Sequence, residues 1–121
     1  MANKLMIFDD DKDIQAICTF IFKRLGWTVC SSENCNDIAH KVKQEYPDVI
    51  LMDNWIPDEG GIVATRTLKQ HEELKHIPVI YFSANRDVES LAEQAGADAY
   101  IKKPFDLKEF ENMVTRYAVH P

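Results

Sequence analysis

Charged side chains directly follow three apolar segments of this 121-residue chain. The segments end in Phe8-Asp9-Asp10-Asp11, in Met52-Asp53-Asn54 and in Tyr100-Ile101-Lys102-Lys103-Pro104. In an open parallel sheet the C-terminal ends of the strands form the edge where ligands bind. Three such endings would bring several acids and a lysine to one mouth, which predicts a metal-dependent phosphate site.

The acids by themselves indicate which cation such a site would hold. Carboxylates gathered at one edge repel each other, and a bound divalent cation allows all of them to stay ionised at neutral pH. A ligand set made only of oxygen atoms points to Mg²⁺, which takes one or two protein carboxylates together with phosphate oxygens. Lys103 would supply the remaining positive charge, so the pattern predicts phosphoryl chemistry.

Apolar runs typical of strands alternate along the chain with segments whose apolar residues recur at helical spacing. Strands are expected at 5–8, 27–30, 49–52, 79–82 and 99–101. Helices are expected at 14–25, 38–46, 62–71, 88–95 and 107–117, with their apolar residues in the core. Pro47 must end the second helix, and Asp106 with Glu109 predicts a capping box for the last one.

Five such strand–helix units, without repeats or a linker, predict one α/β domain over residues 1–121. The expected architecture is a doubly wound, five-stranded parallel sheet. Chain order alone does not give strand order, but flavodoxin-like sheets of this kind commonly have the order 2-1-3-4-5. With strands 1 and 3 adjacent, Asp9, Asp10 and Asp53 would be neighbours.

Composition narrows the classes of partner. The chain has 14 Lys plus Arg and 20 Asp plus Glu, a formal charge of −6, which disfavours general binding to nucleic acid or anionic lipid. Cations and basic protein surfaces are better partners. The segment before Asp9 is too short for a signal peptide or a membrane span, so a cytoplasmic protein is expected. The three cysteines form no Cys-x-x-Cys pair, and zinc is not indicated.

Together these residues resemble a response-regulator receiver domain, the phosphorylatable switch of two-component signalling, over nearly the whole chain. Each functional position of that family has a counterpart here. They are the acidic pair Asp9 and Asp10, the phosphoacceptor Asp53, the switch hydroxyl Ser83, the aromatic switch residue Tyr100, and the lysine and cis-proline Lys103-Pro104.

The resemblance implies that Asp53 accepts a phosphoryl group from a phosphohistidine on a histidine kinase or a histidine phosphotransfer protein. Asp10, Asp53 and the backbone carbonyl of Trp55 would bind Mg²⁺ directly, and Asp9 would bind it through water. Lys103 and Ser83 would contact phosphoryl oxygens. The domain would catalyse only its own phosphorylation and dephosphorylation, so it is not expected to be an enzyme.

The resemblance also implies an output. Ser83 and Tyr100 would switch the face built by 88–95, 99–101 and 107–117, which would bind a downstream protein target. Trp55 and Asn85 occupy positions where family members vary the lifetime of the phosphate. Because no DNA-binding or enzymatic segment follows the last helix, a stand-alone regulator or a phosphorelay intermediate is expected. A receiver excised from a longer protein would look the same.

Other interpretations compete with the receiver. In a haloacid-dehalogenase-like phosphohydrolase, Asp9 would be the nucleophile and Asp11 the acid/base, but the chain is short for that fold and Asp53 would have no role. A flavodoxin-like flavin binder would need a hydroxyl-rich phosphate loop. A pure interaction module with an inert receiver fold would be free to lose an acid, the hydroxyl or the lysine, and all of these are present.

Each residue also has a simpler explanation when it is taken alone. The acids at 9–13 fit a solvated helix entrance, Asp53 a turn or cap, and Lys103 a surface charge. For Tyr100, a partly buried aromatic is as reasonable as a switch. Only the joint pattern favours the phosphate site. Trp27, Phe105 and Cys18 are assigned to packing.

Overall fold

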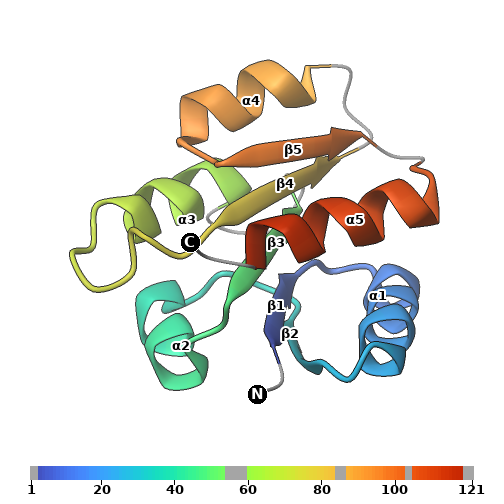
Figure 1. The fold of residues 1–121 in the computed structure, drawn as a ribbon. Helices are drawn as coiled ribbons and strands as arrows, with labels where there is room; N and C mark the ends of the chain where they lie inside the picture. Colours follow the sequence, from blue (N-terminus) through green and yellow to red (C-terminus); the bar gives the residue numbers. More distant parts are fainter. Residues whose placement is uncertain (1–2, 54–59, 84–86, 103–104, 119–121) are drawn as a thin grey trace.

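The computed structural model describes residues 3–53, 60–83, 87–102 and 105–118, along which five strands alternate with five helices (Figure 1). The strands are β1 (Lys4–Phe8), β2 (Thr28–Ser32), β3 (Val49–Asp53), β4 (Val79–Ser83) and β5 (Ala99–Lys102). The helices are α1 (Lys12–Arg24), α2 (Ile38–Glu45), α3 (Gly60–Lys69), α4 (Val88–Ala95) and α5 (Leu107–Ala118).

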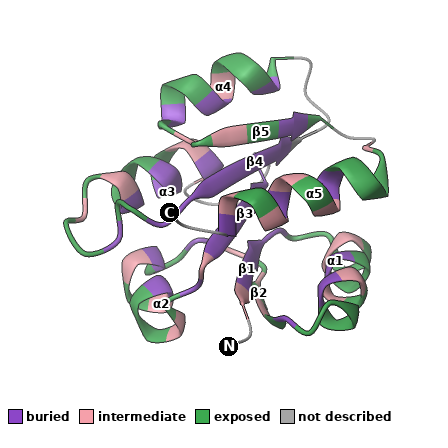
Figure 2. Cartoon of the chain, in the orientation of Figure 1, coloured by how far each residue is buried: buried purple, intermediate pink, exposed green. Residues whose placement is uncertain are grey.

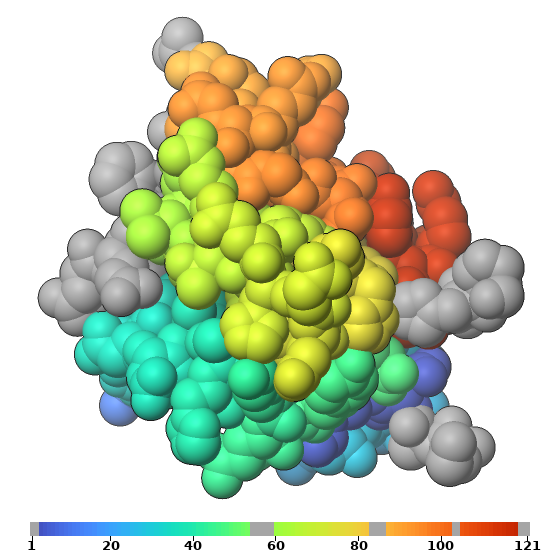
Figure 3. All heavy atoms as spheres, turned by 90° about the vertical axis from the view of Figure 1, so that its left-hand side faces the viewer, coloured from blue at the N-terminus to red at the C-terminus, as the bar shows by residue number. Residues whose placement is uncertain are grey.

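All five strands run parallel in one sheet of order β2-β1-β3-β4-β5, which confirms the predicted topology. Helices α1 and α5 cover one face, and α2, α3 and α4 cover the other (Figure 1). Because side chains alternate along a strand, Leu5 and Ile7 of β1 enter the first of these cores, while Met6 and Phe8 enter the second. The space-filling view shows α3 between α2 and α4 on the second face (Figure 3).

The central strands are buried, whereas the outer faces of the helices are exposed (Figure 2). All five residues of β3 are buried, as expected for a parallel strand covered on both faces. Beneath α1 and α5, the ring of Phe22 lies 5.0 Å from that of Trp27 and 5.7 Å from that of Phe110. Phe105 stacks on Phe110 at 4.6 Å, so the packing roles predicted for Trp27 and Phe105 are confirmed.

The expected bounds of several elements differ from the structure by one or two residues, and two of the predictions are wrong for a clear physical reason. Not every apolar helix residue belongs to the core, because Ile17, Leu25 and Leu107 are exposed. Leu25 is the C-cap of α1, beyond the last turn that packs on the sheet. The second helix also ends one residue early, since Tyr46 has a left-handed backbone, with φ of 44°, and caps α2.

Candidate phosphate and metal site

The pairing of β1 with β3 positions the acids. Phe8 pairs with Met52 in the parallel register. The residues that come next, Asp9 and Asp53, therefore both lie at the C-terminal edge of the sheet. Asp10 comes one residue later, before α1 begins. Carboxylate oxygens of Asp9, Asp10 and Asp53 all lie within 4.8 Å of one another. The sheet therefore brings Asp53 to the adjacent pair Asp9 and Asp10, from which it is far in the sequence.

The three acids differ in their exposure to solvent. Asp9 is 0% exposed and Asp53 is 5% exposed, whereas Asp10 is exposed. The Asp9 backbone N–H donates to the Ser32 carbonyl at 3.1 Å, and the Gln15 side-chain amide donates to the Asp9 carbonyl. One Asp9 carboxylate oxygen accepts the Asp11 N–H at 2.8 Å. The position of Asp9 is thus held from several sides.

This donor set fits a hard divalent cation. Two buried carboxylates side by side cost free energy unless a positive charge lies near them. The cluster offers only oxygen ligands, which suits Mg²⁺. Exposed Asp10 leaves the cluster open to solvent on one side, so an ion could enter.

Asp11 has a different role from the two acids before it. It is the N-cap of α1, and its side chain accepts hydrogen bonds from the N–H groups of Asp13 at 2.9 Å and Ile14 at 3.3 Å. Within the described residues the carboxylate cluster contains Asp9, Asp10 and Asp53, and not Asp11. The simple helix-entrance explanation therefore holds for Asp11 but not for Asp9.

Comparison with known families agrees with this arrangement. The chain matches the model of the response regulator receiver domain over residues 5–115. It belongs to the receiver family. Receiver domains act in two-component signalling, and the family typically binds Mg²⁺ at an acidic pocket.

Among similar proteins, the polar-differentiation response regulator DivK of Brucella ovis is 29% identical over 119 residues, which cover 97% of both chains. The regulatory protein AtoC of Escherichia coli K12 is 33% identical over 116 residues, 94% of this receiver but only 25% of AtoC. The phosphate regulon regulator PhoB of the same organism is 29% identical over 90% of this chain and 48% of PhoB. This receiver thus spans a quarter of AtoC and about half of PhoB.

Solved structures share the fold. A response regulator from Chloroflexus aurantiacus superposes with a TM-score of 0.91 at 22% identity, covering 99% of this receiver and 100% of that chain. The receiver domain of the sensor histidine kinase PA1611 from Pseudomonas aeruginosa has a TM-score of 0.88 at 24% identity over 98% of both chains. No helix within the described residues is long and apolar enough to cross a membrane.

The remaining predicted site residues of this receiver fall into two groups. The predictions for Trp55, Asn85, Lys103 and Pro104 lie outside the described residues. The structure describes the backbone of Ser83, which is the last residue of β4 and pairs with Lys102 of β5. Tyr100 lies on β5 opposite Tyr81 and is 39% exposed. Hydrogen bonding to the Glu89 carboxylate, together with its negative charge, raises the pKa of the Tyr100 hydroxyl.

One polar residue near the site was missed by the sequence analysis, which treated it only as part of a strand. Tyr81 is 0% exposed in the middle of β4 and pairs with Met52, the neighbour of Asp53. Burial raises the pKa of its hydroxyl, and the hydroxyl of Thr65 on α3 opposes that change. A tyrosine within the apolar run at 79–82 was the available signal, because a buried hydroxyl needs a nearby polar group.

Proposed function

We propose that this receiver is a phosphorylatable switch, over residues 1–121, in which Asp53 accepts a phosphoryl group from a phosphohistidine. The donor would be a histidine kinase or a histidine phosphotransfer protein. The observation that carries the proposal is the convergence of the Asp9, Asp10 and Asp53 carboxylates within 4.8 Å at the C-terminal edge of the sheet. An isolated cap or turn acid would have no reason to lie beside two others.

Asp10, Asp53 and the Trp55 backbone carbonyl would bind Mg²⁺ directly, and Asp9 would bind it through water. When bound, Mg²⁺ would supply positive charge that offsets both the carboxylates and the phosphoryl oxygens. The PA1611 receiver domain has a magnesium ion coordinated in its active-site cleft. That finding supports the same cofactor for this chain, since both chains share the fold.

In the transfer itself, a carboxylate oxygen of Asp53 attacks phosphorus while the bond from phosphorus to the histidine nitrogen breaks. The electron pair of that bond stays on the imidazole, and Asp53 becomes an aspartyl phosphate. Lys103 would pair with one phosphoryl oxygen, and the Ser83 hydroxyl would donate to another. Water later releases the phosphate and restores Asp53, so the domain acts only on itself.

The output is proposed to be the face of α4, β5 and α5. Ser83 would move toward the phosphate, and Tyr100 would follow it inward. Phosphorylation can shift an existing equilibrium only if the phosphate interacts better with one of the two states. We propose a stand-alone regulator or a phosphorelay intermediate, which the end-to-end similarity to DivK supports. AtoC and PhoB are longer, so their activities are not transferred to this chain.

The phosphohydrolase alternative is not favoured. It would require Asp11 to serve as the acid/base, yet the Asp11 carboxylate accepts two backbone N–H groups at the start of α1. It also gives no role to Asp53, which lies against Asp9 and Asp10. The family match over residues 5–115 points to the receiver instead.

The test is intact mass after incubation with acetyl phosphate and Mg²⁺, followed by mapping of the modified residue. We expect one added phosphoryl group on Asp53, which is lost with a chelator and in Asp53→Asn. The matched control Asp11→Asn should still be labelled, because asparagine also caps helices. Label on Asp9 that depends on Asp11 would favour the phosphohydrolase, and complete absence of label would favour an inert module.

A further inference from the structure

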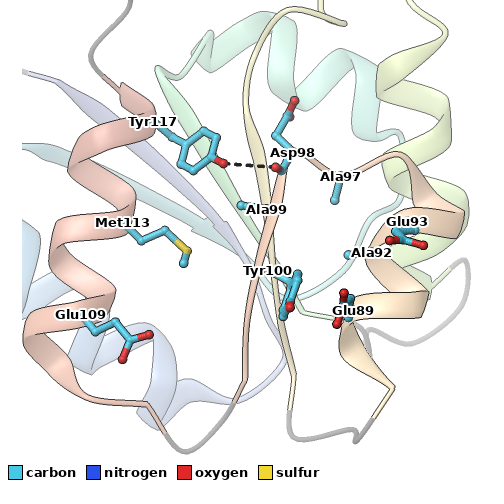
Figure 4. A pocket seen from close by; sticks show the side chains of 10 residues that line it. All are labelled: Glu89, Ala92, Glu93, Ala97, Asp98, Ala99, Tyr100, Glu109, Met113 and Tyr117. Atoms are coloured by element: carbon cyan, nitrogen blue, oxygen red, sulfur yellow. Dashed lines mark hydrogen bonds between the residues drawn. The ribbon is translucent and has the colours of Figure 1, made fainter.

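A groove lies between α4 and α5, with β5 and the residues before it at its base (Figure 4). Its volume is about 530 Å³, enough to receive side chains of a partner. The groove is open because β5 is the edge strand of the sheet, and within the described residues no further strand pairs with it. This is the same face that we propose as the output.

The groove combines an apolar interior with an acidic border. Ala92 of α4, Ala97 before β5 and Met113 of α5 supply apolar surface. Four carboxylates line the same groove, and they are Glu89, Glu93, Asp98 and Glu109. Among the described residues that line the groove, none is a lysine, an arginine or a histidine.

These carboxylates differ in whether a basic side chain of the same protein pairs with them. Asp98 pairs with Lys69 at 2.7 Å. Across the described part of the chain, Glu89, Glu93 and Glu109 have no basic group within ion-pair distance. A second hollow of about 270 Å³ shares Glu89 and Glu93 and extends along α4 to Asp87. The described part of this face therefore presents a row of carboxylates beside an apolar groove.

We propose that this groove binds a cationic segment of a partner protein, with an apolar side chain inserted between α4 and α5. Lysine or arginine side chains on the segment would reach Glu89, Glu93 and Glu109. Charge complementarity carries this choice of occupant, because a second copy would place the same carboxylates against one another. The inference deepens the proposed function and rests on it for the link to phosphorylation.

The contact between Tyr100 and Glu89 would make this binding respond to the switch. The two side chains lie side by side at the groove (Figure 4), and interaction with the Glu89 carboxylate raises the pKa of the Tyr100 hydroxyl. While that contact persists, part of the Glu89 charge is engaged within the domain. Inward movement of Tyr100 after phosphorylation would release Glu89 to the cationic segment and raise its affinity.

The probe is a synthetic peptide of alternating lysine and leucine, titrated into the full chain while backbone amide shifts are followed. We expect the shifts to cluster on α4, β5 and α5. Glu89→Gln combined with Glu93→Gln should weaken binding about tenfold, as the loss of two ion pairs implies. The control Glu33→Gln with Glu72→Gln removes the same charge at exposed sites away from the groove and should bind as wild type.

Two further peptides test the two parts of the recognition. Replacing leucine by serine should weaken binding, because the apolar surface of Ala92 and Met113 would lose its partner. Replacing lysine by glutamate should abolish it. Adding beryllium fluoride with Mg²⁺, to mimic phosphorylated Asp53, should tighten binding of the lysine–leucine peptide severalfold.

Equal weakening by the two double variants would overturn the proposal, since it would show diffuse attraction to an acidic protein. Shifts on another face would overturn it as well. Concentration-dependent dimerisation in sedimentation, mapped to the groove, would instead identify a second copy as the occupant. The mass test on the same samples separates the two proposals: failure of Asp53 to be labelled would refute the proposed function, while titration of unmodified protein still tests the groove.

Discussion

A carboxylate oxygen of Asp53 lies within 4.8 Å of one of Asp9, although the two residues belong to the ends of different strands. The register of β1 against β3 causes this proximity, because Phe8 pairs with Met52 and the acids come next. Both side chains are almost completely buried. Two negative charges so placed repel each other, and a divalent cation bound beside them would reduce that repulsion.

Asp53→Asn should therefore stabilise the protein when Mg²⁺ is removed by a chelator. Loss of one charge beside Asp9 and Asp10 relieves repulsion of roughly 3–4 kcal/mol for each close carboxylate pair at an effective dielectric constant of about 20, and less for Asp10, which is exposed to solvent. With saturating Mg²⁺ the gain should shrink or reverse, because the ion binds the wild-type site better. Urea unfolding in both conditions measures the difference.

Asp11→Asn serves as the control for that measurement. It removes a neighbouring negative charge, but the side chain remains a hydrogen-bond acceptor for the N–H groups of Asp13 and Ile14. We expect its free energy of unfolding to change by only a few tenths of a kcal/mol. If both variants gained equal stability in chelator, general charge reduction rather than the carboxylate cluster would be the cause.

Mg²⁺ should change tryptophan emission in a Trp27→Phe background, which leaves Trp55 as the reporter. Trp55 lies two residues after Asp53, where its carbonyl is proposed to bind the ion. Trp27 must be removed because it is buried against Phe22 and would contribute a constant signal. Adding Asp10→Ala should abolish the response. Unchanged emission, with Mg²⁺ binding established by calorimetry, would contradict the ligand role of Trp55.

Trp55→Asn should shorten the life of the aspartyl phosphate. A large indole beside Asp53 would cover the path of an attacking water, whereas an amide would orient that water. Hydrolysis should accelerate about tenfold if about 1.4 kcal/mol of barrier is removed. Phosphate release from both proteins with Mg²⁺ saturated measures the rates, and equal rates would show that the indole leaves water access unaffected.

Cys30 should make the protein less stable in alkali. Its half-buried thiol lies in a hollow between β2 and α2, and burial, assisted by the charge of Glu45, raises its pKa to about 11 against the partial opposition of Lys4. Because the pKa is higher in the folded state, the resulting stability is present below pH 9.0 and is lost as the pH rises through about 11. Partial exposure reduces the effect to about 1 kcal/mol.

Urea unfolding of wild type and Cys30→Ser from about pH 8 to about pH 11 isolates this contribution. The serine variant should lose less stability over the alkaline part of the range, since its hydroxyl does not ionise there. Glu45→Gln should lower the pKa of the Cys30 thiol. The curve of unfolding free energy against pH for this variant should therefore lie between those of wild type and Cys30→Ser. Parallel curves for all three proteins would show that Cys30 is not responsible.

Much of the fold could be predicted from local sequence, for a physical reason in each case. The run Val49-Ile50-Leu51-Met52 indicates a strand because it is short, apolar at every position and rich in β-branched residues, as a strand covered on both faces is. Helix ends were less predictable, since Tyr46 takes a left-handed conformation that its residue type does not favour. Exposure of Ile17 and Leu107 depends on which side of each helix meets the sheet, which spacing alone leaves open.

The sequence by itself determined the chemical types at the site, because acids directly after apolar strands must lie at the C-terminal edge of a parallel sheet. Only the tertiary structure decided which acids meet. The adjacency of β1 and β3 brings Asp53 to Asp9 and Asp10. The Asp11 side chain instead caps α1 by accepting hydrogen bonds from backbone N–H groups of that helix. The acidic groove is also tertiary in origin, because Glu89 and Glu109 come to line one groove only when α4 and α5 pack on either side of an edge strand.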